Sequence, residues 1–164
     1  MSLYVKWGGL ALMMLASLAV IKGYREYIAR RISEQESFIS MLSHMEGKIN
    51  RYLTPIVESL SDFIDDNLTR IGFFERMADG DSVYDAFNNV SAKLSVGEET
   101  KETLSETFGA LSGRYKDEVL KKLREGISRL EGILSLEREE LSKKERVASV
   151  VLVAAVLGIF ILLV

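Results

Sequence analysis

The sequence has no cysteine, one histidine and one proline in 164 residues. The lack of cysteine excludes disulfides and thiolate chemistry, and with His44 as the only histidine it also excludes a zinc site of cysteine and histidine. Walker-type phosphate loops and the HExxH and GxSxG motifs are missing too. Nucleophilic and metal catalysis therefore lack their usual parts, which predicts a protein that is not an enzyme and that holds no cofactor and no metal.

Charge is missing from both ends of the chain. All 24 acidic residues and 20 of the 21 basic residues lie between Lys22 and Arg146, so Lys6 is the only charged residue in the two flanks together. The middle segment, residues 22–146, has a net charge of −4 and offers no basic surface for wrapping nucleic acid. Nucleic acid is therefore not an expected partner.

Two apolar segments have the length of membrane-spanning helices. Residues 3–21 are interrupted only by Lys6, and residues 147–164 contain no charge at all. A helix needs about 20 residues to cross the hydrocarbon core, and a spanning segment must be helical because lipid offers no partners to the backbone. The sequence therefore predicts two transmembrane helices, with the lipid bilayer of the cell membrane as a partner.

Each predicted span has an alternative interpretation. The first could be a cleaved signal peptide, but its start is barely charged and no small-residue cleavage site precedes Lys22. The second could be a buried core helix, but a chain of this size has too little protein to cover 18 residues that are apolar on every side. An uncleaved anchor and a second span are the favoured interpretations.

Basic residues beside the two spans predict the orientation. Eight cations flank the middle segment, against Lys6 alone on the far side, and cytoplasmic loops carry such an excess. These membrane-flanking cations are Lys22, Arg25, Arg30, Arg31, Arg138, Lys143, Lys144 and Arg146. We therefore expect a two-pass protein whose residues 22–146 lie on the cytoplasmic side.

The middle segment has the pattern of amphipathic helices. An apolar stripe from Phe38 to Ile56 advances by alternate steps of four and three residues, and the pattern is contiguous with the first span. This helix should stop near Leu53, because Pro55 disfavours helix in the residue before it. A last helix from residue 117 merges with the second span. The expected fold is all-α, a membrane-anchored bundle of about six helices whose first and last helices continue into the spans.

Helix-capping signals divide the segment that connects these two long helices into shorter helices. Thr54 and Pro55 are typical of a helix start, and the helix they open should run with Ile64 on its buried face until Gly72. Ser82 with Asp85 three residues later resembles a capping box. The candidate capping and packing residues are Thr54, Pro55, Gly80, Ser82, Asp85 and Gly113.

The remaining polar residues have ordinary interpretations. His44 lies next to the apolar stripe and is predicted to be a surface or boundary side chain. Asp65 and Asp66 are adjacent, so on a helix they diverge by about 100° and suit a solvated face better than a paired-carboxylate site.

The order and spacing of these features resemble those in sequences of the stage III sporulation protein AB family of endospore-forming bacteria. The resemblance covers nearly the whole chain and includes the pair Thr54 and Pro55, an F-G-x-x-x-G element at 108–113, Leu130 with Glu131, and the KKER flank at 143–146, between two apolar ends. The chain departs from the family after Gly113, since Leu120 or Lys121 stands where the family has Gln, so no role of that Gln is carried over. Residues 79–87 also resemble the sequence motif at the start of the helical modules of type II secretion and type IV pilus platform proteins. The sporulation family is thought to be distantly related to these proteins.

The resemblance implies a non-enzymatic platform or scaffold in the channel-like complex between mother cell and forespore. It further implies a position on the mother-cell side of the forespore membrane, other membrane subunits of the complex as neighbours, and a secretion-type ATPase that docks on the cytoplasmic bundle. A homo-oligomer is a further option. Two alternatives stay open: a platform subunit of a type II secretion or pilus-like system, and a membrane-anchored signalling or sensor module, which a substantial apolar cavity would favour.

Overall fold

The computed structural model describes residues 3–52, 55–112 and 115–163. Within these ranges it describes all side chains except those of residues 3–14, 16, 17, 52, 57 and 145–163. Every regular element in the described ranges is a helix. The predicted all-α class is therefore confirmed.

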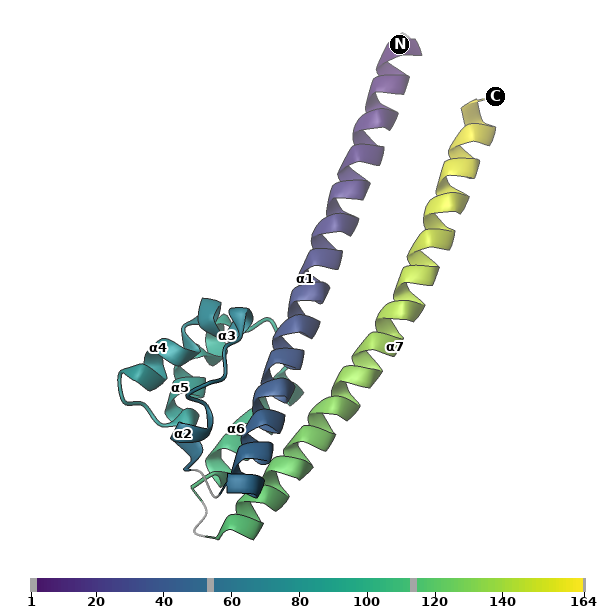
Figure 1. The fold of residues 1–164 in the computed structure, drawn as a ribbon. Coiled ribbons are helices and arrows are strands. Elements are labelled where there is room, and N and C mark those ends of the chain that lie inside the picture. The colour runs from purple at the N-terminus through teal and green to yellow at the C-terminus, as the bar shows by residue number, and fades with distance from the viewer. Residues whose placement is uncertain (1–2, 53–54, 113–114, 164) are drawn as a thin grey trace.

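Two long helices organise the molecule. Helix α1 (Leu3–Tyr52) and helix α7 (Lys116–Leu163) run antiparallel, pack against each other at the end where α1 finishes and α7 begins, and extend together away from it. Figure 1 shows that the N-terminal end of α1 and the C-terminal end of α7 therefore lie on the same side of the molecule. Helix α1 ends at Tyr52, which confirms the predicted stop near Leu53.

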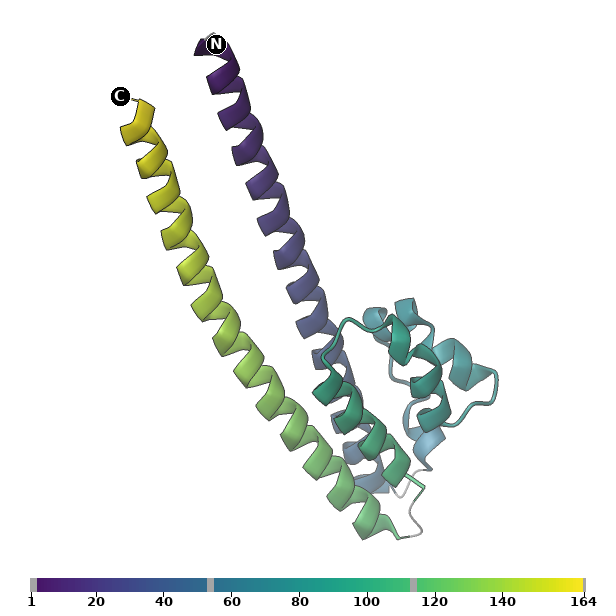
Figure 2. The ribbon, with the colours of Figure 1, turned by 180° about the vertical axis from the view of Figure 1, so that it is seen from behind.

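The short helices between them form a lobe, residues 55–112. They are α2 (Ile56–Ser59), α3 (Asp66–Ile71), α4 (Phe73–Ala78), α5 (Val83–Val90), the 3-10 helix η1 (Ser91–Lys93) and α6 (Glu98–Ala110). Helices α2 and α3 pack on α1, and α6 packs on α7. Figure 2 shows the lobe on one side of the two long helices, beside their packed ends.

Phe38 lies at the centre of the core. Its ring contacts Phe73, Phe87 and Phe108 at centroid distances of 6.1, 5.8 and 6.2 Å, the first two edge to face. Such pairs add to the burial of their apolar area. All four rings are buried, so one aromatic residue of α1 joins three separate segments of the lobe.

Two of the candidate capping residues, Ser82 and Asp85, lie at the start of α5. The Oγ of Ser82 accepts a hydrogen bond from the backbone N–H of Asp85 (3.1 Å) and donates one to the Asp85 carboxylate (2.6 Å). Gly80 has a φ of +100° in the turn that precedes Ser82. Gly72 has a φ of +85° and is at once the residue that ends α3 and the residue that precedes α4.

The prediction of one helix from Thr54 to Gly72 is wrong. Helix α2 stops at Ser59, whose hydroxyl donates to the carbonyl of Ile56 (2.6 Å), and such side-chain bonds compete with the helix ladder. A new helix starts after Asp65, whose carboxylate accepts from the N–H of Leu68 (3.0 Å). Ile64, predicted to be buried, lies in the connection between them and is 85% exposed.

Some predictions fall outside the described part. Thr54 and Gly113 are not among the described residues. The predicted spans, 3–21 and 147–164, consist mostly or wholly of residues whose side chains are not described. Within the part of the chain that the structure describes, no helix is long and apolar enough to cross a membrane.

Candidate functional site

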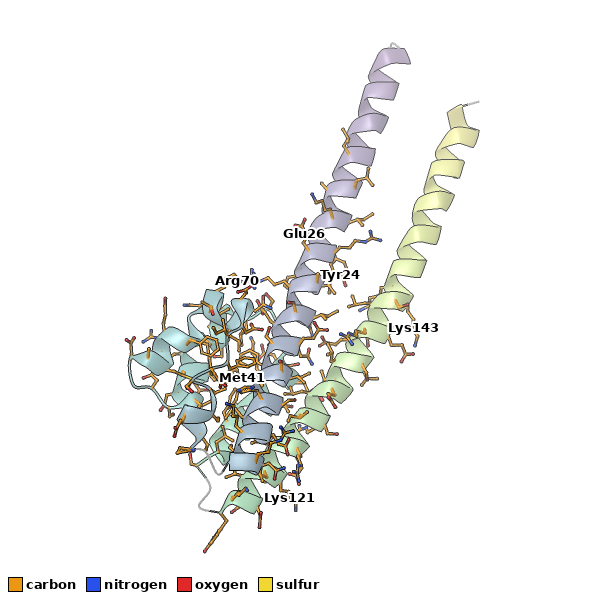
Figure 3. All side chains as sticks on the ribbon, viewed as in Figure 1. Tyr24, Glu26, Met41, Arg70, Lys121 and Lys143 are labelled. Atoms are coloured by element: carbon orange, nitrogen blue, oxygen red, sulfur yellow. The ribbon has the colours of Figure 1, made fainter. Side chains whose placement is uncertain are left out.

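Polar residues gather where α1, α7 and the lobe meet. We call this site the junction. It consists of Tyr27, Arg31, Glu34 and Gln35 on α1, Arg70 on α3, Ser95 and Gly97 in the connection from η1 to α6, and Leu130 and Glu137 on α7. The junction lies on the side of the lobe that faces the free ends of α1 and α7, where Figure 3 labels Arg70.

Arg31 ties three segments together. Its guanidinium forms an ion pair with Glu137 of α7 and lies directly on Gly97, where a Cβ would come within 2.5 Å of Nη2. Burial lowers the pKa of Arg31, but the hydrogen bond from its guanidinium to the Glu137 carboxylate and the charge of that carboxylate outweigh it, so the pKa is raised. Arg31 stays charged, and the absence of a side chain at residue 97 gives it room.

Glu34 is a buried carboxylate that serves as a common acceptor. It is 1% exposed, and one of its oxygens accepts from Arg30 Nε (2.9 Å) and lies 3.6 Å from Arg70 Nη2. The other oxygen accepts from the backbone N–H of Ser95 (2.7 Å). A buried charge is tolerated only when it is paired and hydrogen-bonded in this way. Glu34 therefore fixes α3 and the connection before α6 onto α1.

Gln35 joins the two long helices directly. Its amide Nε2 donates to the backbone carbonyl of Leu130 in α7 (3.2 Å), and the side chain is fully buried. Within the described part of the chain, the Gln35 Oε1 and the Arg31 Nε are buried without a hydrogen-bond partner. One turn of α1 thus carries an unpaired buried acceptor and an unpaired buried donor.

Further polar contacts lock α1 against α7 along their packed length. Arg138 pairs with Glu36, Arg124 donates through Nε and Nη2 to one oxygen of Glu46 (2.9 and 2.7 Å), and Lys116 donates to the carbonyl of Asn50 (2.9 Å). A shallow groove of about 320 Å³ runs between the two helices, lined by Glu36, Ile39, Ser40, Glu131, Leu134, Ser135 and Arg138. This volume is at the lower limit of ligand pockets, about 300 Å³.

The predicted flanking cations fall into two groups. Arg31 belongs to the junction, Arg30 pairs with the junction residue Glu34, and Arg138 belongs to the contact between α1 and α7. These three cations therefore have a structural role in the bundle. Lys22, Lys143 and Lys144 lie further along the long helices and are mostly exposed. Arg25 also makes an interaction, and the side chain of Arg146 lies outside the described part.

His44 belongs to a contact at the other end of the lobe. Its Nε2 lies 3.1 Å from Asp62 Oδ1, its ring packs against Phe63 at 5.2 Å, and Lys48 donates to the second oxygen of Asp62 (2.6 Å). Hydrogen bonds from Lys48 and His44 lower the pKa of Asp62. The prediction that His44 is a boundary side chain is confirmed, and Asp62 is the residue that fastens the α2 to α3 connection to α1.

The described residues contain no group of three or more His, Cys, Asp or Glu side chains arranged to hold a metal ion. What the junction can do is mechanical. It fixes the register of α1 against α7 and attaches the lobe to both.

Glu34 and Gln35 were not among the functional or packing residues predicted from the sequence. The signal was available for Gln35, because the apolar stripe extended back from Phe38 by three and then four residues reaches Gln35 and Arg31. Polar residues in phase with a core stripe indicate a specific buried contact, since an unpaired polar group there would cost about 1–3 kcal/mol. Glu34 carried no comparable signal, because its pair with Arg30 has the ordinary i, i+4 spacing of a helix surface and its other partners come from segments 36 and 61 residues away.

A profile of the stage III sporulation protein AB family matches residues 6–164. No curated protein and no solved structure matches the chain. The matched range includes α7, the whole lobe and all but the first three residues of α1, which is nearly the full length of the protein. The chain therefore belongs to the stage III sporulation protein AB family.

Proposed function

We propose that this chain is a non-enzymatic membrane scaffold of the stage III sporulation channel complex. Two transmembrane helices root it in the forespore membrane from the mother-cell side, and the lobe with the packed ends of α1 and α7 lies in the cytoplasm. The family assignment supports a role in stage III of sporulation. Membrane rooting and docking of a secretion-type ATPase are the two further parts of this function.

The contact between α1 and α7 is the observation that carries the membrane rooting. Counted along each helix from the Arg31–Glu137 ion pair, Ile21 and Val147 both lie ten residues away. The helices are continuous over these residues, so each apolar edge lies about 15 Å beyond the pair at ~1.5 Å per residue. Two spans that enter one bilayer side by side need this match.

A second contact gives nearly the same register. Counted from the Arg124–Glu46 ion pair, Ile21 lies 25 residues away on α1 and Val147 lies 23 residues away on α7. The difference of two residues corresponds to about 3 Å along a helix. Contacts inside the bundle thus align two apolar segments that are themselves far from those contacts.

The lobe supplies the surface for the proposed ATPase. Residues 55–112 contain twelve acidic and four basic residues, although the whole chain is almost neutral. Glu99 and Glu102 on the outer face of α6 are exposed. Complementary charge speeds encounter and suppresses wrong partners. We propose that a basic surface of the ATPase contacts this acidic lobe.

Membrane rooting can be tested with single cysteines, because the chain has none of its own. A cysteine at Ser61, which is exposed on the lobe, should react with a membrane-impermeant maleimide only after the membrane is opened. In non-sporulating cells that produce the chain, where the cell membrane is the bilayer available to it, a cysteine at Lys6 should react from the outside of intact cells. Release of the full chain by alkaline carbonate, or labelling of the Ser61→Cys variant in intact cells, would contradict the proposal.

Docking can be tested by copurification of the complex's secretion-type ATPase with the full chain. The double variant Glu99→Lys/Glu102→Lys should lose the ATPase, whereas the matched variant Glu125→Lys/Glu131→Lys on the exposed face of α7 should retain it. Equal retention by both variants would exclude the α6 face as the docking surface. Unchanged helical circular dichroism of both variants serves as the control for folding.

The alternative of a platform subunit in another secretion system differs from this proposal only in its partner. Copurification of pilus or type II secretion subunits instead of sporulation subunits would favour it.

A further inference from the structure

Three ion pairs near the predicted membrane surface have the same polarity. They are Lys22 with Glu26 on α1 (3.9 Å), Lys143 with Glu139 (2.7 Å) and Lys144 with Glu140 (3.3 Å) on α7. In each pair the lysine lies on the side of the apolar segment and the glutamate lies one turn closer to the lobe. Because the helices are antiparallel, this requires lysine before glutamate on α1 and glutamate before lysine on α7, and both orders occur.

The pairs therefore form two charged layers around the two helices. Lys22 directly follows Ile21, and Lys143 and Lys144 lie four and three residues before Val147. At ~1.5 Å per residue the lysine backbones lie about 1.5–6 Å from the apolar edges. The layer of lipid headgroups is about 5–7 Å thick on each side of the hydrocarbon core. The three lysines fall within this layer, and the glutamates that pair with them begin at its outer limit. Glu145 and Arg146 also fall within the layer by their position in the helix, and their opposite charges leave its excess of lysine unchanged.

Exposure agrees with this arrangement. The side chains of Lys22, Lys143 and Lys144 are 78, 72 and 63% exposed, so their ammonium groups have room for another acceptor besides the glutamate. Tyr24 is half exposed at the same depth, and tyrosine is enriched where hydrocarbon meets water. Figure 3 shows Lys143 beside the part of α1 that carries Tyr24 and Glu26, and Lys121 at the opposite end of α7.

We propose that Lys22, Lys143 and Lys144 form a headgroup ring that selects anionic phospholipids. The ligand group is a lipid phosphate whose charge is not cancelled by a cation within the same headgroup, as in phosphatidylglycerol. The glutamates hold the lysines in place by pairing with them from the lobe side, and they repel negative charge that approaches from that side. This inference rests on the membrane rooting proposed above, and it adds the lipid class.

The test uses the full chain reconstituted in bilayers of phosphatidylcholine that contain a minority of phosphatidylglycerol. Spin-labelled forms of the two lipids report which of them is immobilised next to the protein. We expect phosphatidylglycerol to be preferred several-fold at low salt, and 0.5 M NaCl to remove most of the preference because salt screens exposed charges. The variant Lys143→Gln/Lys144→Gln should reduce the preference to less than about half, since an unpaired surface cation contributes about fivefold at most and these lysines are paired with glutamates.

The variant Lys121→Gln/Lys122→Gln is the matched control. It removes two exposed lysines from the same helix, and both also pair with a glutamate of that helix, Glu125. These lysines lie 26 and 25 residues before Val147, about 38 Å at ~1.5 Å per residue and well beyond the screening length of about 8–10 Å. Their removal should leave the lipid preference unchanged.

The outcomes separate this inference from membrane rooting. If the chain does not stay in the bilayer at all, the rooting fails and the ring fails with it. If the chain stays but shows no preference for phosphatidylglycerol, or if the control variant loses as much as the test variant, only the ring is overturned. If 20 mM inorganic phosphate abolishes the preference at constant ionic strength, the lysines bind free phosphate, which overturns the assignment to lipid.

Discussion

Thr107 of α6 and Gly126 of α7 are in such close contact that no side chain fits between them. A Cβ on Gly126 would overlap the Oγ1 of Thr107 and lie 2.8 Å from its Cγ2. Thr107 cannot easily turn away, because it is buried and its hydroxyl donates to the carbonyl of Thr103 (2.7 Å). This pair sets the distance between the lobe and α7.

The variant Gly126→Ala should therefore destabilise the protein by about 1–3 kcal/mol, the usual cost of overpacking a core. Gly132→Ala on the same helix is the control, since nothing lies within 4 Å of its added Cβ. There alanine should raise stability by up to about 1 kcal/mol through helix propensity. Denaturant unfolding of the full chain in one detergent measures both, and equal effects at the two glycines would contradict the close packing.

The two ion pairs between α1 and α7 near the junction should differ in strength. The side chains of Arg31 and Glu137 are 28 and 20% exposed, whereas those of Arg138 and Glu36 are 55 and 46% exposed. Arg31→Met should cost about 1–3 kcal/mol because it leaves Glu137 partly buried without its partner. Arg138→Met should cost less than about 1 kcal/mol, as is usual for surface pairs. Unfolding free energies that rank the two variants in the opposite order would show that the junction is not anchored by Arg31.

The cap of α5 provides a third prediction. Ser82→Ala removes the acceptor of the Asp85 N–H and should reduce stability by about 1 kcal/mol, the usual cost of a lost N-cap. Ser128→Ala is the control, because Ser128 lies on an exposed face inside α7 and not at a helix start. This substitution should be neutral or slightly stabilising. A thermal midpoint that falls only for Ser82→Ala would agree with the prediction. No change at Ser82 would mean that the cap does not stabilise the lobe.

The Asp62 contact should depend on pH. Because Lys48 and His44 lower the pKa of Asp62 in the folded state, its ionised form stabilises the fold. That stabilisation is complete above the pKa of an unfolded aspartate, about 3.9, and is lost as the pH falls through the lower folded value. The stability difference between the natural chain and Asp62→Asn should thus be constant above about pH 5 and shrink progressively as the pH falls below about 3.9. A difference that does not shrink below about pH 3.9 would contradict the assignment to this carboxylate.

Periodic apolar positions predicted the long helices and the buried faces of α5 and α6 correctly. Phe38, Phe87 and Phe108 occupy the core as expected, since a helical stripe has only one face to bury. The break inside residues 54–72 was not predicted, because Ile64 continues the helical spacing of the sequence, and Asp65, which caps the start of α3, looked like an ordinary solvated residue. Glu34 was missed for another reason, since Arg70 and Ser95, the partners that bury it, are brought to it only by the tertiary fold.

Gly72 occupies the point where α3 ends and α4 starts, with a φ of +85°. The residue that replaces it in any variant must adopt a left-handed backbone, which costs an L-amino acid about 1–2 kcal/mol. The strain would act on two helices at the same time, because a single residue sets the bend between them. A substitution here would therefore change the orientation of Phe73 and Phe74 relative to Leu68 and alter the packing of the lobe on Phe38. Gly72 has this effect although it contributes no side chain to the core.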